Sequence, residues 1–169
     1  MLSLFKNIGM SSFYSKLVVG LLLSFSVIAL VLMLLVQELT QNYQSEVEQK
    51  LHIDLAEHIV SDDKLLKDGK LDQTALKHMF HSMMILGPSF EFYVVTPEGL
   101  VTTYSADDDK IKRMQVDVTP IKAFLSGQAS LPILGDDPRS SFKKKIFSVA
   151  PITYQGALQG YLYVIIGGE

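Results

Sequence analysis

An uncharged apolar run from Leu17 to Val36 constrains this chain more than any other feature. As an α-helix the run would be about 30 Å long, which matches the hydrocarbon core of a bilayer. A cleavable signal peptide has a shorter apolar region, of about 7–15 residues, and ends at a cleavage site made of small residues. The segment 36–40 offers no such site. We therefore expect an uncleaved transmembrane helix at residues 17–36.

The charges that flank this run predict its orientation. Lys6 and Lys16 precede it, whereas the first charged residue after it is the acidic Glu38. Because positively charged flanks stay in the cytoplasm, residues 1–16 are expected there, and residues from about 37 onward are expected outside.

Composition excludes several classes of function. The formal net charge of −3 argues against a nucleic-acid partner. The absence of cysteine is compatible with an oxidising compartment. The chain also lacks a Gly-x-Ser-x-Gly elbow, a phosphate-binding glycine loop and a His-Glu-x-x-His helix. We expect no catalytic residue and no cofactor within these 169 residues.

Residues 37–71 are predicted to continue the helix out of the membrane. Apolar residues recur four apart from Leu39 to Ile59. A heptad repeat averages 3.5 residues per turn, so this stripe drifts around the helix and forms no coiled-coil seam. We interpret the segment as a signalling helix that pairs with its twin in a homodimer near the membrane and covers its own domain further out.

The remaining residues, 72–169, are predicted to form one α+β domain. A helix is followed by strand-like alternation, a short helix and further strands. Such an order builds an antiparallel sheet with helices packed on one face. The expected elements are a helix at 72–86 (buried face Leu76, Met79, Phe80 and Met83), strands at 89–95 and 100–104, a helix at 119–127, a loop at 132–138, and strands at 142–152 and 160–166.

Four stretches of this domain, together with the apolar run ahead of it, resemble one protein family. They are Phe90–Val101, with its Thr-Pro-Glu-Gly turn, Gly135–Arg139, Lys145–Ile152 and Gly160–Glu169. In their order and spacing they are similar to the input region of proteobacterial sensor histidine kinases, which carries a PAS-like (PDC/CACHE-type) domain. The resemblance implies a PAS-like sensor domain at 72–169 that lies in the periplasm and is held in the inner membrane.

The same resemblance implies the rest of a signalling protein. A second membrane helix, a HAMP linker, a phosphoacceptor helix pair and an ATP-binding domain would follow, so we expect these residues to be the front of a longer protein. ATP and Mg are expected only in that downstream kinase, and its partner would be a response regulator. The implied function is to relay a ligand or envelope cue across the inner membrane. A chemotaxis receptor or a cyclic-dinucleotide enzyme with the same input, or an anchored periplasmic binding protein without cytoplasmic output, remain alternatives that the residues beyond 169 would distinguish.

The resemblance also places a ligand pocket. PAS-like domains keep their pocket between the sheet and the segment that crosses over it, which here is 105–134. We expect contacts to an unknown small ligand or periplasmic protein from this crossover and from the sheet behind it, with Tyr93, Tyr104 and Arg113 as the leading candidates. The alternative for the two tyrosines is that they fill the core with their hydroxyls hydrogen-bonded or at the surface.

Two further cations are candidates for an anionic ligand. The lysines at 143–145 alternate across a predicted strand, so two share a face and the third points away. We take Lys144 as the candidate from this run, and Arg139 as a guanidinium that can bind an oxyanion through two hydrogen bonds. The alternative is a solvated outer face for the lysines and a loop-anchoring hydrogen bond for Arg139.

Clustered acids and histidines complete the candidates. Asp107, Asp108 and Asp109 can contact a cation or a cationic peptide through their carboxylates, or can form a solvated acidic loop. His58 shares a helix face with apolar residues and titrates near neutral pH, so it is a candidate pH switch or a partly buried structural histidine. His78 and His81 are too few for a complete metal site, and no metal is expected.

Overall fold

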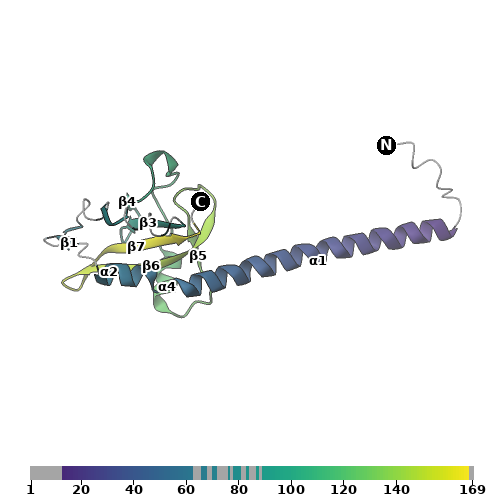
Figure 1. The fold of residues 1–169 in the computed structure, drawn as a ribbon, viewed down its shortest axis with the longest axis horizontal. Coiled ribbons are helices and arrows are strands. Elements are labelled where there is room, and N and C mark those ends of the chain that lie inside the picture. Colours follow the sequence, from purple (N-terminus) through teal and green to yellow (C-terminus); the bar gives the residue numbers. More distant parts are fainter. Residues whose placement is uncertain are drawn as a thin grey trace. The chain divides into compact units, whose positions relative to one another are not determined.

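The computed structural model describes residues 13–62, 66–67, 70–71, 76, 78–80, 83, 87 and 89–167. The chain divides into two units, Met1–Asn42 and Tyr43–Glu169. A long helix, α1 (Phe13–Leu51), contributes residues to both units (Figure 1).

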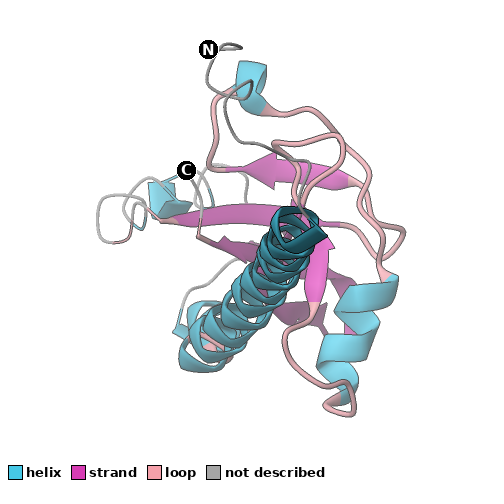
Figure 2. Cartoon of the chain, turned by 90° about the vertical axis from the view of Figure 1, so that its right-hand side faces the viewer, coloured by secondary structure: helices cyan, strands magenta, loops and turns pink. Residues whose placement is uncertain are grey.

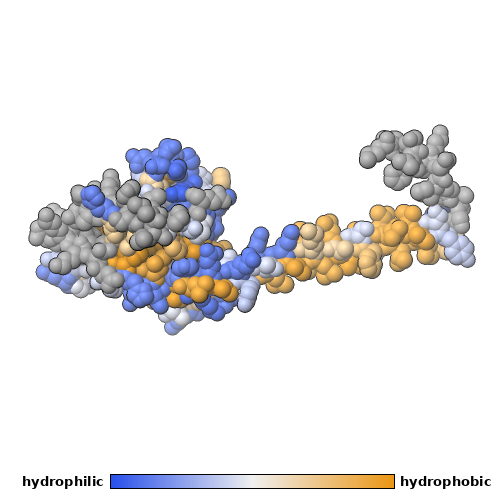
Figure 3. All heavy atoms as spheres, viewed as in Figure 1, coloured by the Kyte–Doolittle hydropathy of each residue, from blue (hydrophilic) through white to orange (hydrophobic). Residues whose placement is uncertain are grey.

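In the first unit α1 is an exposed apolar helix. It is long and apolar enough to cross a membrane by length and composition, and none of its most apolar stretch is buried. Its apolar side chains form the orange band along the helix in Figure 3. The hydroxyls of Ser26 and Thr40 donate to the carbonyls of Leu22 (2.9 Å) and Val36 (2.8 Å), one turn earlier. The helix predicted at 17–36 is therefore present, and the hydroxyls of Ser26 and Thr40 are satisfied within α1.

The helix predicted over 37–71 is interrupted. α1 ends at Leu51, a turn follows at 52–54, and α2 covers Leu55–Asp62. Beyond it, β1 (Leu66–Lys67) and β2 (Lys70–Leu71) pair as short antiparallel strands. The predicted helix is present through α1 and α2, and the spacing of apolar residues did not indicate the turn between them or the two short strands after them.

The second unit is built on a five-stranded antiparallel sheet. Its strand order is β4-β3-β7-β6-β5 (Figures 1 and 2). The strands are β3 (Phe90–Val95), β4 (Val101–Tyr104), β5 (Leu134–Asp136), β6 (Lys144–Tyr154) and β7 (Ala157–Ile166). The predicted α+β class and antiparallel sheet are confirmed. β5 occupies the segment expected as a loop, since a three-residue edge strand has too short a pattern to recognise.

Turn chemistry explains the hairpins. Gln155 and Gly156 connect β6 to β7 with φ values of 49° and 81°. Two consecutive positive φ values are typical of the type I′ turn, whose twist matches that of the flanking strands. In the β3–β4 hairpin Gly99 has a φ of 96°, and its N–H donates to the carbonyl of Thr96 (2.9 Å).

The sheet carries a core on each face. Phe92 and Val94 of β3 point to one face, and Tyr93 and Val95 point to the other, as strand alternation requires. The first face packs against α2 and against the residues of 76–83 that the structure describes, among which Leu76 and Phe80 are buried and Met79 and Met83 are partly buried. The remaining residues of the helix predicted at 72–86 lie outside the described part of the chain.

The second face is covered by the long connection between β4 and β5. These strands lie at opposite edges of the sheet, so residues 105–133 cross from one edge to the other. This crossover contains the 3-10 helix η2 (Asp108–Lys110) and α4 (Thr119–Ser126), which ends at Gly127 with a φ of 65°. Because Ile121 and Phe124 of α4 pack on this face, the expectation that all helices lie on one face is wrong.

Two buried polar side chains join the helices of the second unit to the sheet. The amide of Gln49, in the last turn of α1, is 0% exposed and donates to the carbonyls of Ile133 (3.0 Å) and Phe147 (2.8 Å). Its oxygen accepts from the N–H of Ile133 at 2.8 Å. The hydroxyl of Ser148 in β6 donates to the carbonyl of Ile53 (2.8 Å). The end of α1 is thus hydrogen-bonded to the end of the crossover and to β6.

Candidate functional site

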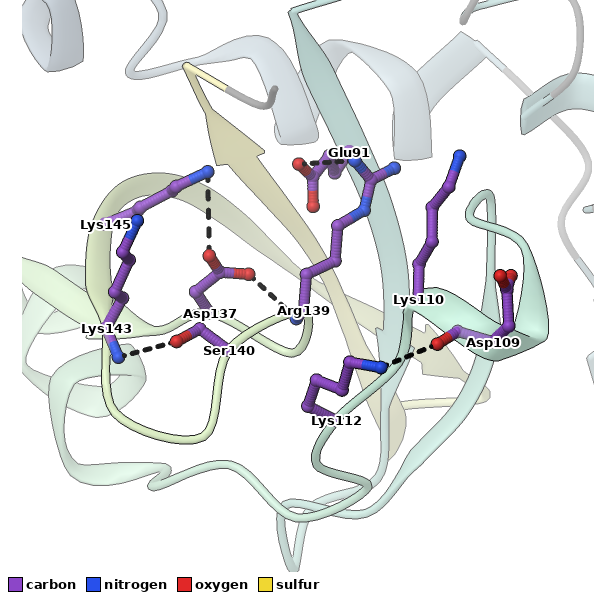
Figure 4. A pocket seen from close by; sticks show the side chains of 9 residues that line it. All are labelled: Glu91, Asp109, Lys110, Lys112, Asp137, Arg139, Ser140, Lys143 and Lys145. Carbon is purple, nitrogen blue, oxygen red and sulfur yellow. Dashed lines mark hydrogen bonds and ion pairs between the residues drawn. The ribbon is translucent and has the colours of Figure 1, made fainter.

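A polar pocket of about 470 Å³ lies between the beginning of the crossover and the loop that joins β5 to β6 (Figure 4). Three separate segments of the second unit contribute to it: β3, residues 109–112 and residues 137–145. Its lining consists of Glu91, Asp109, Lys110, Lys112, Asp137, Arg139, Ser140, Lys143 and Lys145.

Glu91 is a buried carboxylate in the central part of the sheet. It is 1% exposed, and its Oε1 pairs with Nη1 of Arg139 at 3.1 Å. The hydroxyl of Tyr93, two residues along the same strand, donates to Oε2 of Glu91 at 2.6 Å. A buried carboxylate costs several kcal/mol unless it is paired and hydrogen-bonded, so this arrangement needs both partners. Burial raises the pKa of the Tyr93 phenol well above its ordinary value, and the hydrogen bond to Glu91 raises this pKa further.

Asp137 shapes the loop that carries Arg139. It is 2% exposed, and its Oδ1 accepts from the N–H of Arg139 at 2.9 Å while Oδ2 lies 3.5 Å from Nζ of Lys145. The N–H of Ser140 donates to its carbonyl at 3.0 Å. The carboxylate of Asp137 therefore accepts a hydrogen bond within the turn and also pairs with Lys145. The turn directs the guanidinium of Arg139 toward Glu91 (Figure 4).

Arg113 braces this loop from the crossover but does not line the pocket. Its Nη1 pairs with Oδ1 of Asp136 at 2.8 Å, and its Nε donates to the carbonyl of Ser140 at 2.8 Å. The N–H groups of Lys112 and Arg113 donate to the carbonyl of Pro138 (2.8 and 3.1 Å). These contacts fix the crossover against the loop, so both walls of the pocket are held together.

The mouth of the pocket is cationic. Lys110, Lys112 and Lys143 are exposed there. Lys110 pairs with Asp107 at 2.8 Å, and Nζ of Lys112 donates to the carbonyl of Asp109 at 2.9 Å. The lining holds five cationic side chains against three carboxylates, an excess of two positive charges on a chain whose net charge is −3. The pocket is therefore a positive spot on a negative protein.

The predicted site residues are only partly brought together. Arg139 lines the pocket, and Tyr93 lies behind it as a fully buried core residue bonded to Glu91. Tyr104 lies elsewhere, and its hydroxyl donates to Oδ1 of Asp108 at 2.9 Å. This hydrogen bond raises the pKa of the Tyr104 phenol.

Some residues of the lysine run 143–145 and of the aspartate run 107–109 line the pocket, and others do not. Lys143 and Lys145 line the pocket, whereas Lys144 is exposed and does not. Among the aspartates, Asp109 reaches the pocket, while Asp107 and Asp108 contact Lys110 and Tyr104. The hydrogen bond from Lys110 lowers the pKa of the Asp107 carboxyl. Consecutive carboxylates thus point to different partners and do not converge on one point.

Neither His58 nor His78 lines the pocket. His58 is exposed on α2, not partly buried as its helix face suggested. His78 is exposed, and His81 lies outside the described residues.

Sequence reasoning missed Glu91, Asp137 and the lysines at 110 and 112. A signal for Glu91 was present, because it is the one charged residue inside the otherwise uncharged strand Phe90–Val95. Lys110 ends the three-residue helix η2, and Lys112 and Asp137 lie in irregular segments, so no periodicity indicates which of these side chains turn inward.

A second hollow of about 470 Å³ lies between α2, α4 and β6. It is lined by Ile53, Asp54, Glu57, Val60, Ser61, Phe124, Leu125, Val149, Ala150 and Pro151. Its lining is a mixture of apolar groups with two carboxylates and has no cation, so the polar pocket is the better candidate for a recognition site.

Comparisons of this chain with protein-family models, with curated proteins and with solved structures give no match.

Proposed function

We propose that this chain is the membrane-anchored, extracytoplasmic input region of a sensor histidine kinase, and that its second unit is a periplasmic PAS-like domain that reads a ligand or envelope cue. The observation that carries the proposal is α1. This one helix is apolar and exposed through the first unit, and its last turn is hydrogen-bonded to the sheet in the second unit through Gln49. The same helix thus supplies the apolar first unit and is hydrogen-bonded within the second unit, so a change in the second unit can act on it.

The path from the pocket to α1 is short. Ile133, which exchanges two hydrogen bonds with Gln49, ends the crossover and immediately precedes β5. Asp137 of the pocket immediately follows β5. Only the three residues of β5 separate Asp137 from Ile133, where α1 is attached. A cue that moves the loop at Asp137 therefore acts close to this attachment. Signalling requires that the cue bind two arrangements of this region with different affinities.

The crossover supports the PAS-like assignment. It spans the sheet from edge to edge, packs its apolar side chains on one face and leaves a pocket beneath its beginning. Long connections in compact domains are commonly functional.

A topology experiment tests the proposal. A reporter that is active only outside the cytoplasm, fused after Gly87, should give signal, and a reporter active only in the cytoplasm should be silent there. The same two reporters fused ahead of Lys16 should give the opposite pattern. Cytoplasmic activity at Gly87 would refute the proposed orientation.

The proposed homodimer has its own test. Leu39 and Tyr43 are 68% and 67% exposed on α1 and are apolar, so they are available to pack against a partner helix. Single cysteines at these positions should crosslink under oxidation in membranes, whereas a cysteine at the exposed Lys122 of α4 should not. Uniform failure to crosslink along residues 37–51 would indicate a monomeric anchor.

The output is tested separately. A second membrane helix followed by kinase motifs in the downstream reading frame would support a histidine kinase, while chemoreceptor or cyclic-dinucleotide motifs would favour those outputs. A purified parent protein should then transfer phosphate from ATP to a histidine.

A further inference from the structure

The cations of the polar pocket come from three segments that approach one another only in the folded chain. Lys110 and Lys112 belong to the crossover, Arg139 and Lys143 to the β5–β6 loop, and Lys145 to β6. Like charges repel, so gathering five of them costs free energy that the three carboxylates of the lining, together with Asp107 beside Lys110, only partly offset. An arrangement of this kind attracts an anion from solution.

Two rim lysines keep their charge available. In the part of the chain that the structure describes, Lys143 has no carboxylate partner, and the ammonium of Lys112 is bonded to a backbone carbonyl. A backbone carbonyl is a dipole and does not neutralise the ammonium. Both side chains can therefore approach a bound anion without first breaking an ion pair.

The carboxylate of Glu91 pairs with the guanidinium of Arg139 as the oxyanion of a ligand would. Its carboxylate meets the guanidinium at the inner end of the pocket, at 3.1 Å (Figure 4). If a ligand oxyanion takes over the guanidinium, Glu91 keeps the hydrogen bond from the Tyr93 hydroxyl at 2.6 Å. Exchange unpairs a buried carboxylate, so the ligand's contacts with Arg139 and the rim lysines must outweigh that cost, which the remaining hydrogen bond from Tyr93 reduces.

The dimensions indicate a small molecule. Ligand sites of small molecules typically enclose roughly 300–1,000 Å³, and this pocket has about 470 Å³. Its lining residues are all polar or charged, which suits a ligand that carries charge over most of its surface.

We infer that this pocket binds a small oxyanion, a molecule bearing carboxylate or phosphate groups, and that the ligand replaces Glu91 as the partner of Arg139. This assignment names the cue of the proposed sensor and rests on the proposed function for its biological role. The exchange also supplies a difference between the free and bound states, because Arg139 and the loop around Asp137 have a different partner in each.

Calorimetric titration of the purified full chain in a non-ionic detergent tests the inference. Inorganic phosphate, succinate and citrate are titrated in a Tris buffer, with glycerol and putrescine as neutral and cationic controls. We expect saturable binding of at least one of the three anions, weakened by added salt, and none of glycerol or putrescine. Phosphate binding without carboxylate binding assigns a phosphate ligand, and the reverse assigns a carboxylate ligand.

Two neighbouring lysines provide a matched pair of variants. Lys143→Gln should weaken anion binding about fivefold, the effect of one solvated charge at contact distance. Lys144→Gln removes the same charge one residue away, from an exposed side chain outside the pocket, and should bind as the wild type does. Equal weakening by both variants would overturn the inference, since only a general effect of net charge would then be at work.

The variant Glu91→Gln tests the exchange itself. Loss of the internal carboxylate removes the competitor of the ligand for the guanidinium of Arg139, so anion affinity should rise roughly tenfold. A purely structural Glu91 predicts unchanged or weaker binding. The double variant Glu91→Gln, Arg139→Gln removes both members of the ion pair and should lose binding while remaining folded, which circular dichroism checks.

Failure of the inference and failure of the proposed function are distinguishable. No binding of any tested anion, together with extracytoplasmic reporter activity after Gly87, overturns the inference and leaves the sensor topology standing. Anion binding with the pattern above, together with cytoplasmic reporter activity after Gly87, refutes the proposed orientation and supports the pocket as an anion site.

Discussion

Replacement of Gln49 by leucine should destabilise the second unit strongly. The side chain is fully buried and takes part in three hydrogen bonds, two to Ile133 and one to Phe147. Leucine has a similar size but leaves these backbone groups without their amide partner. Each net hydrogen bond contributes about 1 kcal/mol, and a buried group left unsatisfied costs about 1–3 kcal/mol. We expect a loss of about 3 kcal/mol in the free energy of unfolding, a large share of the roughly 5–15 kcal/mol typical of a domain.

Urea unfolding of the full chain in detergent provides the assay. The far-ultraviolet signal would be dominated by α1, so the transition should be followed by near-ultraviolet circular dichroism of the buried tyrosines Tyr93 and Tyr163. The midpoint should fall at unchanged slope. Gln44→Leu makes the same chemical change at an exposed position of the same helix, and should shift stability by no more than about 0.5 kcal/mol. Equal effects at the two positions would refute the attachment of α1 through Gln49.

Two further predictions concern the edges of the pocket and of the crossover. Gly135→Ala places a methyl group against the hydroxyl of Tyr163 and 2.9 Å from the ring of Phe147, so it should cost about 1–3 kcal/mol of stability, measured by the same urea transition; an unchanged midpoint would contradict this packing. The backbone N–H of Thr119 donates to Asp117 at 2.9 Å and lowers the pKa of that carboxyl. Because the pKa of Asp117 is lower in the folded state, this stabilisation is present above the unfolded pKa of about 4 and is lost as the pH falls through the folded pKa. In a pH series below about 4, the wild type should therefore lose stability relative to Asp117→Asn. Parallel stability curves for the two proteins would contradict this prediction.

The local elements of this protein are largely readable from its sequence. The apolar run, the Thr-Pro-Glu-Gly turn and the Gln155-Gly156 turn each carry their signal within a few residues, and the structure has the expected helix and hairpins there. Pro120 near the start of α4 and Gly127 after its end likewise predict that helix. Such features are determined locally because backbone sterics and hydrogen bonding to near neighbours decide them.

The site is less readable because its groups are distant in the sequence. Arg139 was recognised as a cation for an anionic ligand, but nothing near it indicates that its partner is Glu91, 48 residues earlier. In the lysine run, strand alternation predicted that two members share a face. Which face turns toward the pocket was decided by the pairing of β6 with β7 and β5.

The sequence by itself determined the apolar helix, the antiparallel α+β character of the second unit and the turns between its strands. Tertiary structure decided where α1 ends, which face α4 covers, and that Gln49 and Glu91 are buried with partners far along the chain. The physical reason is that period and turn preference are properties of neighbouring residues. Burial, ion pairing and the pocket are properties of segments that meet only when the sheet has formed in one register.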